Sequence, residues 1–152
     1  MLKYFKEIFS NEADTANKMS GNNRKLEIAA CALLLEIAKA DDNFSSDEKN
    51  RVSEIMKEIF RLSSEEVKDI ITASEESMEN SISLYEFTDV LNHQLNNDEK
   101  YQILKYLWQI AYIDGNLDKY EDHYIKTISN NLHLYNKDRI AAKLEVKEEL
   151  GL

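Results

Sequence analysis

The chain has 152 residues, no proline and three glycines, and 43% of its residues are hydrophobic and 32% charged. This composition predicts one compact helical domain, because a sheet protein needs more turn-forming residues. The formal net charge of -10 is spread along the chain. It argues against nucleic-acid binding, since it repels phosphate backbones, and favours cationic partners such as basic protein surfaces and metal ions.

Residues 1–21 are predicted to form an amphipathic helix followed by a polar linker. Leu2, Phe5, Ile8 and Phe9 make a short apolar stripe, which lysines and a glutamate interrupt, so the segment is not expected to be a signal peptide. Three roles remain open for it. It docks on the rest of the protein, it anchors the protein at a membrane surface or to a partner, or it is a frayed end.

The single cysteine, Cys31, lies in an apolar run and is expected to be a buried packing residue. A chain without a second cysteine forms no internal disulfide, which fits a reducing cytosol. No apolar run approaches the ~20 residues needed to span a bilayer. We therefore expect a cytoplasmic protein without a transmembrane segment, peripheral at the inner face of the membrane if the N-terminal helix anchors it.

Apolar residues recur at helical spacing throughout residues 22–150, which are predicted to be one domain. Residues 26–37 are apolar on nearly every side, as in a central buried helix. The other predicted stripes are Val52, Ile55, Met56, Ile59 and Phe60; Val67, Ile70, Ile71 and Met78; Leu84, Phe87, Leu91 and Leu95; Ile103, Leu104, Leu107, Ile110 and Ala111; Ile125, Ile128 and Leu132; and Ile140 and Leu144. The fold class is all-α.

Helix starts are marked by capping signals, in which a hydroxyl or amide oxygen accepts an amide of the first turn and a glutamate three residues later reaches back. The predicted pairs are Ser45 with Glu48, Ser63 with Glu66, Ser83 with Glu86, Asn96 with Glu99, and Asp118 with Glu121; Asn136 is the predicted cap of the last helix.

Two acidic corners repeat at a constant spacing of 73 residues. The first reads AKADDNFSSDEK, residues 38–49, and the second reads AYIDGNLDKYED, residues 111–122. Apolar positions of the flanking helices follow the same spacing. This predicts two related three-helix units, joined by the helix of residues 84–95, in a single bundle with internal pseudo-twofold duplication.

Two interpretations of the corners are open. Their Asp, Asn, Ser and Glu residues are helix caps and Asx turns, or they are oxygen ligands of a divalent cation, and the two roles are compatible. The corners are not EF-hands, because the sixth loop position is Ser46 or Lys119 and not glycine, and the twelfth is apolar. The candidate metal ligands are Asp41, Asp42, Glu48, Asp114, Asp118 and Glu121.

No catalytic arrangement is indicated. His93, His123 and His133 lack ligand-type spacing, and no Ser–His–Asp order, phosphate-binding glycine loop or cysteine nucleophile is present. We expect no enzymatic activity and no cofactor except a divalent metal ion, with calcium, magnesium, manganese and zinc as the candidates.

The runs LLLEIAKADDNFSSDEKNRV, SLYEFTDVLN and LWQIAYIDGNLDKYEDHYI resemble the tellurite resistance protein B (TerB-like) family, over about residues 26–147. The small stand-alone bacterial members are the most similar. The resemblance implies a bundle of about seven or eight helices, no established catalytic activity, and a link to tellurite resistance and stress responses. It also implies metal binding by acidic residues of the corners, which by position are Asp41, Glu48, Asp114 and Glu121.

The leading hypothesis is a non-enzymatic domain, of residues 22–150, that binds a divalent cation or a protein partner through its acidic corners. The alternative is an interaction scaffold or adaptor without a metal role, held at a membrane surface by its N-terminal helix. The oligomeric state is not indicated by the sequence.

Overall fold

A computed structural model of the protein describes residues 16–40, 45–81, 83–113, 117 and 119–152, with side-chain environments from Asn23 onward. The described residues form seven helices and no strands, which confirms the all-α prediction. The helices are α2 (Ala16–Ala38), α3 (Ser46–Phe60), α4 (Ser64–Asn80), α5 (Tyr85–Gln94), α6 (Asn97–Ala111), α7 (Lys119–Asn131) and α8 (Asn136–Glu149).

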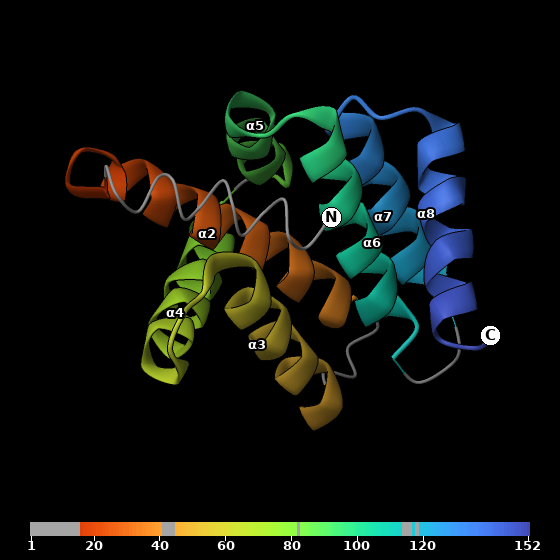
Figure 1. Cartoon of the computed structure of the whole chain (residues 1–152), viewed down its shortest axis with the longest axis horizontal. Helices are drawn as coiled ribbons and strands as arrows, with labels where there is room; N and C mark the ends of the chain where they lie inside the picture. The colour runs from red at the N-terminus through yellow and green to blue at the C-terminus, as the bar shows by residue number, and fades with distance from the viewer. Residues whose placement is uncertain (1–15, 41–44, 82, 114–116, 118) are drawn as a thin grey trace.

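Helix α2 is the centre of the bundle, as its sequence predicts. It packs against α3, α4, α5, α6 and α7, and Figure 1 shows it crossing the molecule between them. The segment from Ala29 to Leu35 is buried on every side. A helix that is apolar all round has no face suited to water, so this sequence is stable only when other helices cover it.

Helix α6 is the second strongly apolar helix, and it packs against α2, α3, α7 and α8. Trp108 is buried and donates its indole Nε1–H to the carbonyl oxygen of Arg139 on α8, at 3.1 Å. Nζ of Lys105 lies 2.7 Å from Glu149 Oε1 and 3.2 Å from Glu145 Oε2, and both glutamates are on α8. Packing and polar contacts together therefore hold α8 against α6.

Three of the predicted capping boxes are present. Ser45 with Glu48, Ser63 with Glu66, and Asn96 with Glu99 make both reciprocal bonds at the starts of α3, α4 and α6. The prediction for Ser83 and Glu86 is wrong. Helix α5 begins at Tyr85, and its N-cap Leu84 makes no side-chain cap bond. The carbonyl of Ser83 instead accepts the hydroxyl of Ser81 at 2.8 Å.

The last helix also starts differently from the prediction. Asn136 is the first residue of α8, and Tyr135 is its N-cap. The carboxylate of Asp138 accepts the backbone N–H of Tyr135 at 3.1 Å. The predicted cap therefore lies one residue too far along the chain. The Asp118–Glu121 box includes Asp118, which is outside the described residues.

The face of α8 that meets the core is not the predicted one. Ala142 and Val146 are buried, whereas Ile140 and Leu144 are 48% and 59% exposed. Ile140 and Leu144 are one turn apart, so they share a helix face that points away from α6 and α7. The spacing of apolar residues predicts the helix but not which of its faces is covered.

The ends of the helices agree with the 73-residue spacing. Helices α2 and α6 end at Ala38 and Ala111, and α3 and α7 begin at Ser46 and Lys119. The agreement stops at the third helix of each unit, because Val67 is buried but its counterpart Ile140 is exposed. A spatial pseudo-twofold axis stays a prediction.

Helix α2 begins at Ala16 and continues without a break past residue 21. The helix thus crosses the predicted boundary between the linker and the domain, while residues 1–15 lie outside the described part of the chain. Within the described residues, no helix combines the length and apolar character needed to cross a membrane.

Candidate cation or partner site

The structure places two of the six predicted ligands. Glu48 lies in the first turn of α3 and Glu121 in the first turn of α7. Asp41, Asp42, Asp114 and Asp118 lie outside the described residues. The two glutamates are only 7% and 5% exposed, respectively. Two carboxylates that are separated by 73 residues in the chain thus share one structural setting, the buried side of a helix's first turn.

Glu48 is held by its own helix cap. Its Oε1 accepts the hydroxyl of Ser45 at 3.1 Å and the backbone N–H of Ser45 at 3.4 Å. The backbone N–H of Glu48 donates in return to Ser45 Oγ at 3.1 Å. The hydrogen bonds fix the carboxylate at the first turn of α3, near the positive end of the helix dipole. Capping therefore orients Glu48. The capping bonds use its Oε1 and its backbone N–H, and they do not involve its second oxygen, Oε2.

Glu121 stands on the same helix face as Ile125 and Ile128, which are both fully buried. Leu117, just before α7, packs against the core as a partly buried side chain. The apolar neighbours on its own helix therefore direct Glu121 inward. This matches Glu48, which shares its face of α3 with Val52 and Ile55.

A polar contact between α3 and α6 joins the two repeated units beside their corners. Arg51, less than one turn after Glu48, donates from Nη2 to Oε1 of Gln109, which is two residues before the end of α6. The other guanidinium nitrogen, Nη1, lies 3.1 Å from Glu54 Oε2 and 3.7 Å from Glu58 Oε1. Two carboxylates thus face one positive charge, which leaves a net charge of -1 at this place.

A groove of about 480 Å³ lies beside this contact. Its lining residues are Arg51, Glu54, Gln109, Tyr112, Ile113, Leu150 and Leu152. Ile113 immediately precedes Asp114, so the groove reaches the edge of the second corner. Burial, together with the nearby carboxylate of Asp122, raises the pKa of Tyr112. The groove thus combines an apolar floor with a polar wall that comes mainly from α3 and α6.

Sequence reasoning missed Arg51 and Gln109 as neighbours of the corners. They lie on different helices, 58 residues apart, and each is an ordinary residue of an amphipathic helix. Charge alone gives no signal that a surface arginine bridges two elements. Only the packing of α3 against α6 brings them together.

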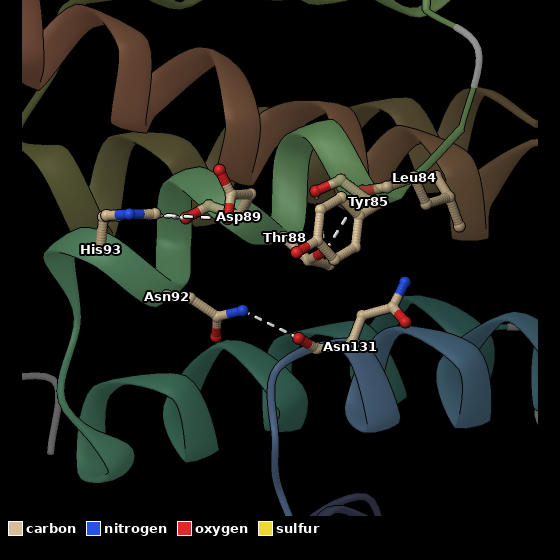
Figure 2. Close-up of polar contacts among 7 residues, drawn as sticks. All are labelled: Leu84, Tyr85, Thr88, Asp89, Asn92, His93 and Asn131. Carbon is tan, nitrogen blue, oxygen red and sulfur yellow. Dashed lines mark hydrogen bonds and ion pairs between the residues drawn. The ribbon is translucent and has the colours of Figure 1, made fainter.

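The central motif SLYEFTDVLN has a structural role in the described residues. Figure 2 shows that Asn92 on α5 donates from Nδ2 to the carbonyl of Asn131 at the end of α7, at 2.8 Å. Thr88 turns its hydroxyl back to the carbonyl of Tyr85 at 3.1 Å. The Asn92–Asn131 bond therefore joins α5 to α7 of the second unit, while Phe87 and Leu91 of the same motif are buried in the core.

His93 contacts one carboxylate, that of Asp89, whose Oδ1 lies 3.6 Å from Nδ1 of the imidazole. His93 Nδ1 lies 2.8 Å from the carbonyl oxygen of Asp89, one turn earlier on its own helix (Figure 2), and its side chain is 74% exposed. Among the described residues, no three His, Cys, Asp or Glu side chains are grouped so that they would hold a metal ion. A complete cation site therefore requires the aspartates of the corners.

The fold defines a class of all-α domains in which the described helices pack around one apolar central helix, and the sequence adds two acidic corners that repeat at a spacing of 73 residues. Within that class, the family model of the tellurite resistance protein TerB matches residues 27–144. The chain belongs to the TerB family, as its sequence motifs predict. No significant match was found among curated proteins or among solved structures.

Proposed function

We propose that this TerB-family domain is a non-enzymatic binding module that holds a divalent cation through its two acidic corners, and that it acts in the cytoplasm in a tellurite or other stress response. The observation that carries the proposal is the equivalent burial of Glu48 and Glu121 at the start of α3 and α7. Members of the TerB family are generally not enzymes, which supports binding over catalysis.

Oxygen chemistry supports a cation as the ligand. Calcium, magnesium and manganese prefer several carboxylate and carbonyl oxygens at once. Each corner offers an aspartate, an asparagine and a glutamate within eight residues: Asp41, Asn43 and Glu48 in the first, and Asp114, Asn116 and Glu121 in the second. A buried carboxylate with a fixed orientation favours binding, because less side-chain freedom is lost when the ion arrives.

The charge balance around Arg51 also supports the proposal. An arginine beside a cation site weakens binding by repulsion, but Glu54 and Glu58 lie within 4 Å of its guanidinium and offset its charge. The domain as a whole carries a net charge of -10, which draws cations towards it.

The proposal also assigns the cellular compartment. Cys31 is a buried free thiol in the middle of α2. A free thiol is typical of a reducing compartment. Cytoplasmic location fits this feature and is readily checked by fractionating cells that produce the tagged protein.

The test uses the double variant Asp41→Asn with Asp114→Asn, which removes two charges and keeps the side-chain shapes. Calorimetry with calcium, magnesium, manganese and zinc chlorides should give binding heat for the wild type and little for the variant. At a hundredfold excess over the dissociation constant, we expect the melting temperature of the wild type to rise by roughly 5–10 °C.

Asp69→Asn is the matched control, because Asp69 is exposed in the middle of α4 and belongs to neither corner. This variant should bind and melt like the wild type. Absence of heat and of thermal stabilisation with all four metals at millimolar concentration would remove the cation from the proposal.

The exposed apolar face of α8 favours a second candidate function, a protein-interaction scaffold without a metal role. Ile140 and Leu144 are large apolar residues on one face of a helix, and Tyr135, next to its start, is 71% exposed. Exposed apolar residues that gather on one face are typical of partner-binding surfaces. The scaffold version includes an N-terminal anchor at a membrane surface, formed by residues 1–21.

The pair Ile140→Asp with Leu144→Asp tests the scaffold. If α8 is the binding face, this variant loses a co-purifying partner that the wild type and the Tyr120→Asp control retain, since Tyr120 is an exposed residue of α7. Equal recovery of the partner with the wild type, the double variant and the control would exclude α8 as the binding face. Flotation with anionic liposomes, with and without residues 1–15, tests the anchor separately and leaves α2 complete.

A further inference from the structure

A second groove, of about 470 Å³, lies far along α2 from the acidic corners. Its floor is made by apolar or small side chains of three helices, and its rim is polar. The floor residues are Ile28, Ala29, Ala73, Phe87 and Val90, and the rim residues are Lys25, Glu76, Ser77, Asn80 and Glu86. Figure 1 shows α4 and α5 on either side of the first half of α2.

The floor of this groove is only partly covered by the described residues. Ala29 and Phe87 are buried, but Ile28, Ala73 and Val90 keep part of their surface exposed. Each exposed apolar side chain costs free energy that burial would recover, at about 25 cal/mol per Å². Burial of these side chains under an apolar segment of matching size would therefore contribute favourably to its binding.

The chain itself contains such a segment, which precedes α2 in the sequence. Residues 2–9 carry the apolar side chains Leu2, Phe5, Ile8 and Phe9 at the spacing of one helix face. These residues lie outside the described part of the chain, which begins with α2 at Ala16. The segment is therefore tethered to the helix that forms one wall of the groove.

The tether is long enough to bring the segment back. Along α2, Ala16 and Ile28 are separated by about 18 Å at 1.5 Å per residue. Residues 10–15 span up to about 20 Å when extended. A short tether also keeps the local concentration of the segment high, in the millimolar range for flexible linkers.

The two surfaces have opposite net charges, +1 for residues 2–9 with Lys3, Lys6 and Glu7, and -1 for the rim with Lys25, Glu76 and Glu86. Lys3 and Lys6 lie together on one flank of the predicted stripe. On the groove rim, Glu76 projects from α4 and Glu86 from α5. Contacts of this kind contribute little affinity at a solvent-exposed rim, but they select the direction in which the segment lies.

We propose that residues 2–9 dock as an amphipathic helix in the groove between α2, α4 and α5 of the same molecule, with Phe5 and Ile8 on the apolar floor. The proposal does not depend on cation binding, because the groove and the acidic corners share no residue. It gives the N-terminal segment an intramolecular role in place of a membrane anchor.

Hydrogen exchange of the full ¹⁵N-labelled chain, followed by NMR, tests the docking. In the wild type, the amides of residues 5–9 should exchange at least about tenfold more slowly than in a free peptide of the same sequence. Phe5→Asp in the segment and Val90→Asp in the groove should each return these amides to the rate of the peptide. Leu144→Asp, the same kind of substitution on the exposed face of α8, should leave them protected.

A spin label at Ser10→Cys gives a measurement that does not depend on the folding of a groove variant. Cys31 is buried, so the label attaches to residue 10 alone. Docking predicts line broadening at the amides of Ile28 and Val90 that is the same at low and high protein concentration.

Three results would overturn the proposal. In the first, residues 5–9 exchange at the rate of the peptide in the wild type. In the second, Val90→Asp is folded and keeps the protection. In the third, spin-labelled protein without ¹⁵N is mixed with ¹⁵N protein that has no spin label, and the amides of the ¹⁵N protein are broadened. The segment then docks on a second copy of the chain.

Discussion

Glu27 on α2 is the carboxyl whose ionisation opposes folding most clearly. Burial raises its pKa from 4.5 to about 7, and the negative charge of Glu66 adds to the effect, while Arg24 acts in the opposite direction. Between these two pH values the unfolded chain has released a proton that the folded chain retains. The free energy of unfolding therefore falls as the pH rises from 4.5 to 7 because of this group.

We predict that Glu27→Gln stabilises the protein at pH 8 and has little effect near pH 4, because the amide cannot ionise. Urea unfolding at pH 4, 6 and 8 measures the difference. Glu65→Gln is a suitable control, since Glu65 is exposed on α4. A destabilisation by Glu27→Gln that is equal at all three pH values would show that packing, and not charge, determines the role of this residue.

Cys31 has no exposed surface, and burial raises its pKa to about 12. The thiolate, which is the reactive form, is therefore scarce, and reagents reach it only when α2 is uncovered. We predict that a disulfide reagent modifies native Cys31 at least about 100-fold more slowly than a free thiol at pH 8, and that urea above the unfolding midpoint abolishes the difference. Fast modification without urea would contradict the burial of this helix face.

At the scale of whole helices, the contrast between α3 and α8 gives a matched pair of substitutions. Ile55 on α3 is fully buried and Ile140 on α8 is 48% exposed. We predict that Ile55→Ala lowers the free energy of unfolding by about 2–5 kcal/mol, because it leaves a cavity, and that Ile140→Ala changes it by less than about 0.5 kcal/mol. Chemical denaturation of both variants gives the two values, and equal losses would place Ile140 in the core.

The same contrast shows how much of the fold the sequence predicts. Helix α2 has apolar residues on nearly all sides, so its central position follows directly from its sequence. Helix α8 has apolar residues on two faces, one with Ala142 and Val146 and one with Ile140 and Leu144. Spacing cannot choose between these faces, because the choice depends on which helix lies opposite.

The sequence also predicts some helix starts and not others. Ser45, Ser63 and Asn96 cap as predicted, whereas Ser83 fits the same pattern and does not cap. The pattern identifies a side chain able to cap, but the path of the preceding chain determines whether it reaches the amides. The same limit applies to the candidate site. The inward direction of Glu48 can be predicted from the apolar face of its own helix, but the contact of Arg51 with Gln109 depends on how α3 packs against α6.

For the whole molecule, charge repulsion and ion pairing act in opposite directions when salt is added. The net charge of -10 repels itself, and this repulsion is screened by salt. Exposed pairs such as Lys39 with Glu75 are also weakened, but each contributes only about 0–1 kcal/mol. Repulsion should dominate, and we predict that the melting temperature rises by a few degrees, roughly 2–4 °C, between 10 and 300 mM sodium chloride.

Magnesium chloride at the same ionic strength separates screening from specific binding. Equal shifts with both salts indicate screening alone, and a larger shift with magnesium indicates the cation site. A fall in melting temperature with sodium chloride would show that ion pairs, such as those of Lys105 with Glu145 and Glu149, outweigh the repulsion.

The central place of α2 has a consequence for the order of events during synthesis. Helix α2 ends at Ala38 and is synthesised before the helices that cover it. One of these, α7, ends at Asn131, which is 93 residues later in the chain. At a synthesis rate of 5–20 residues per second, the apolar sides of α2 stay uncovered for roughly 5–20 s until α7 has been made. We therefore expect chaperones that bind apolar helices to bind the nascent chain during this interval.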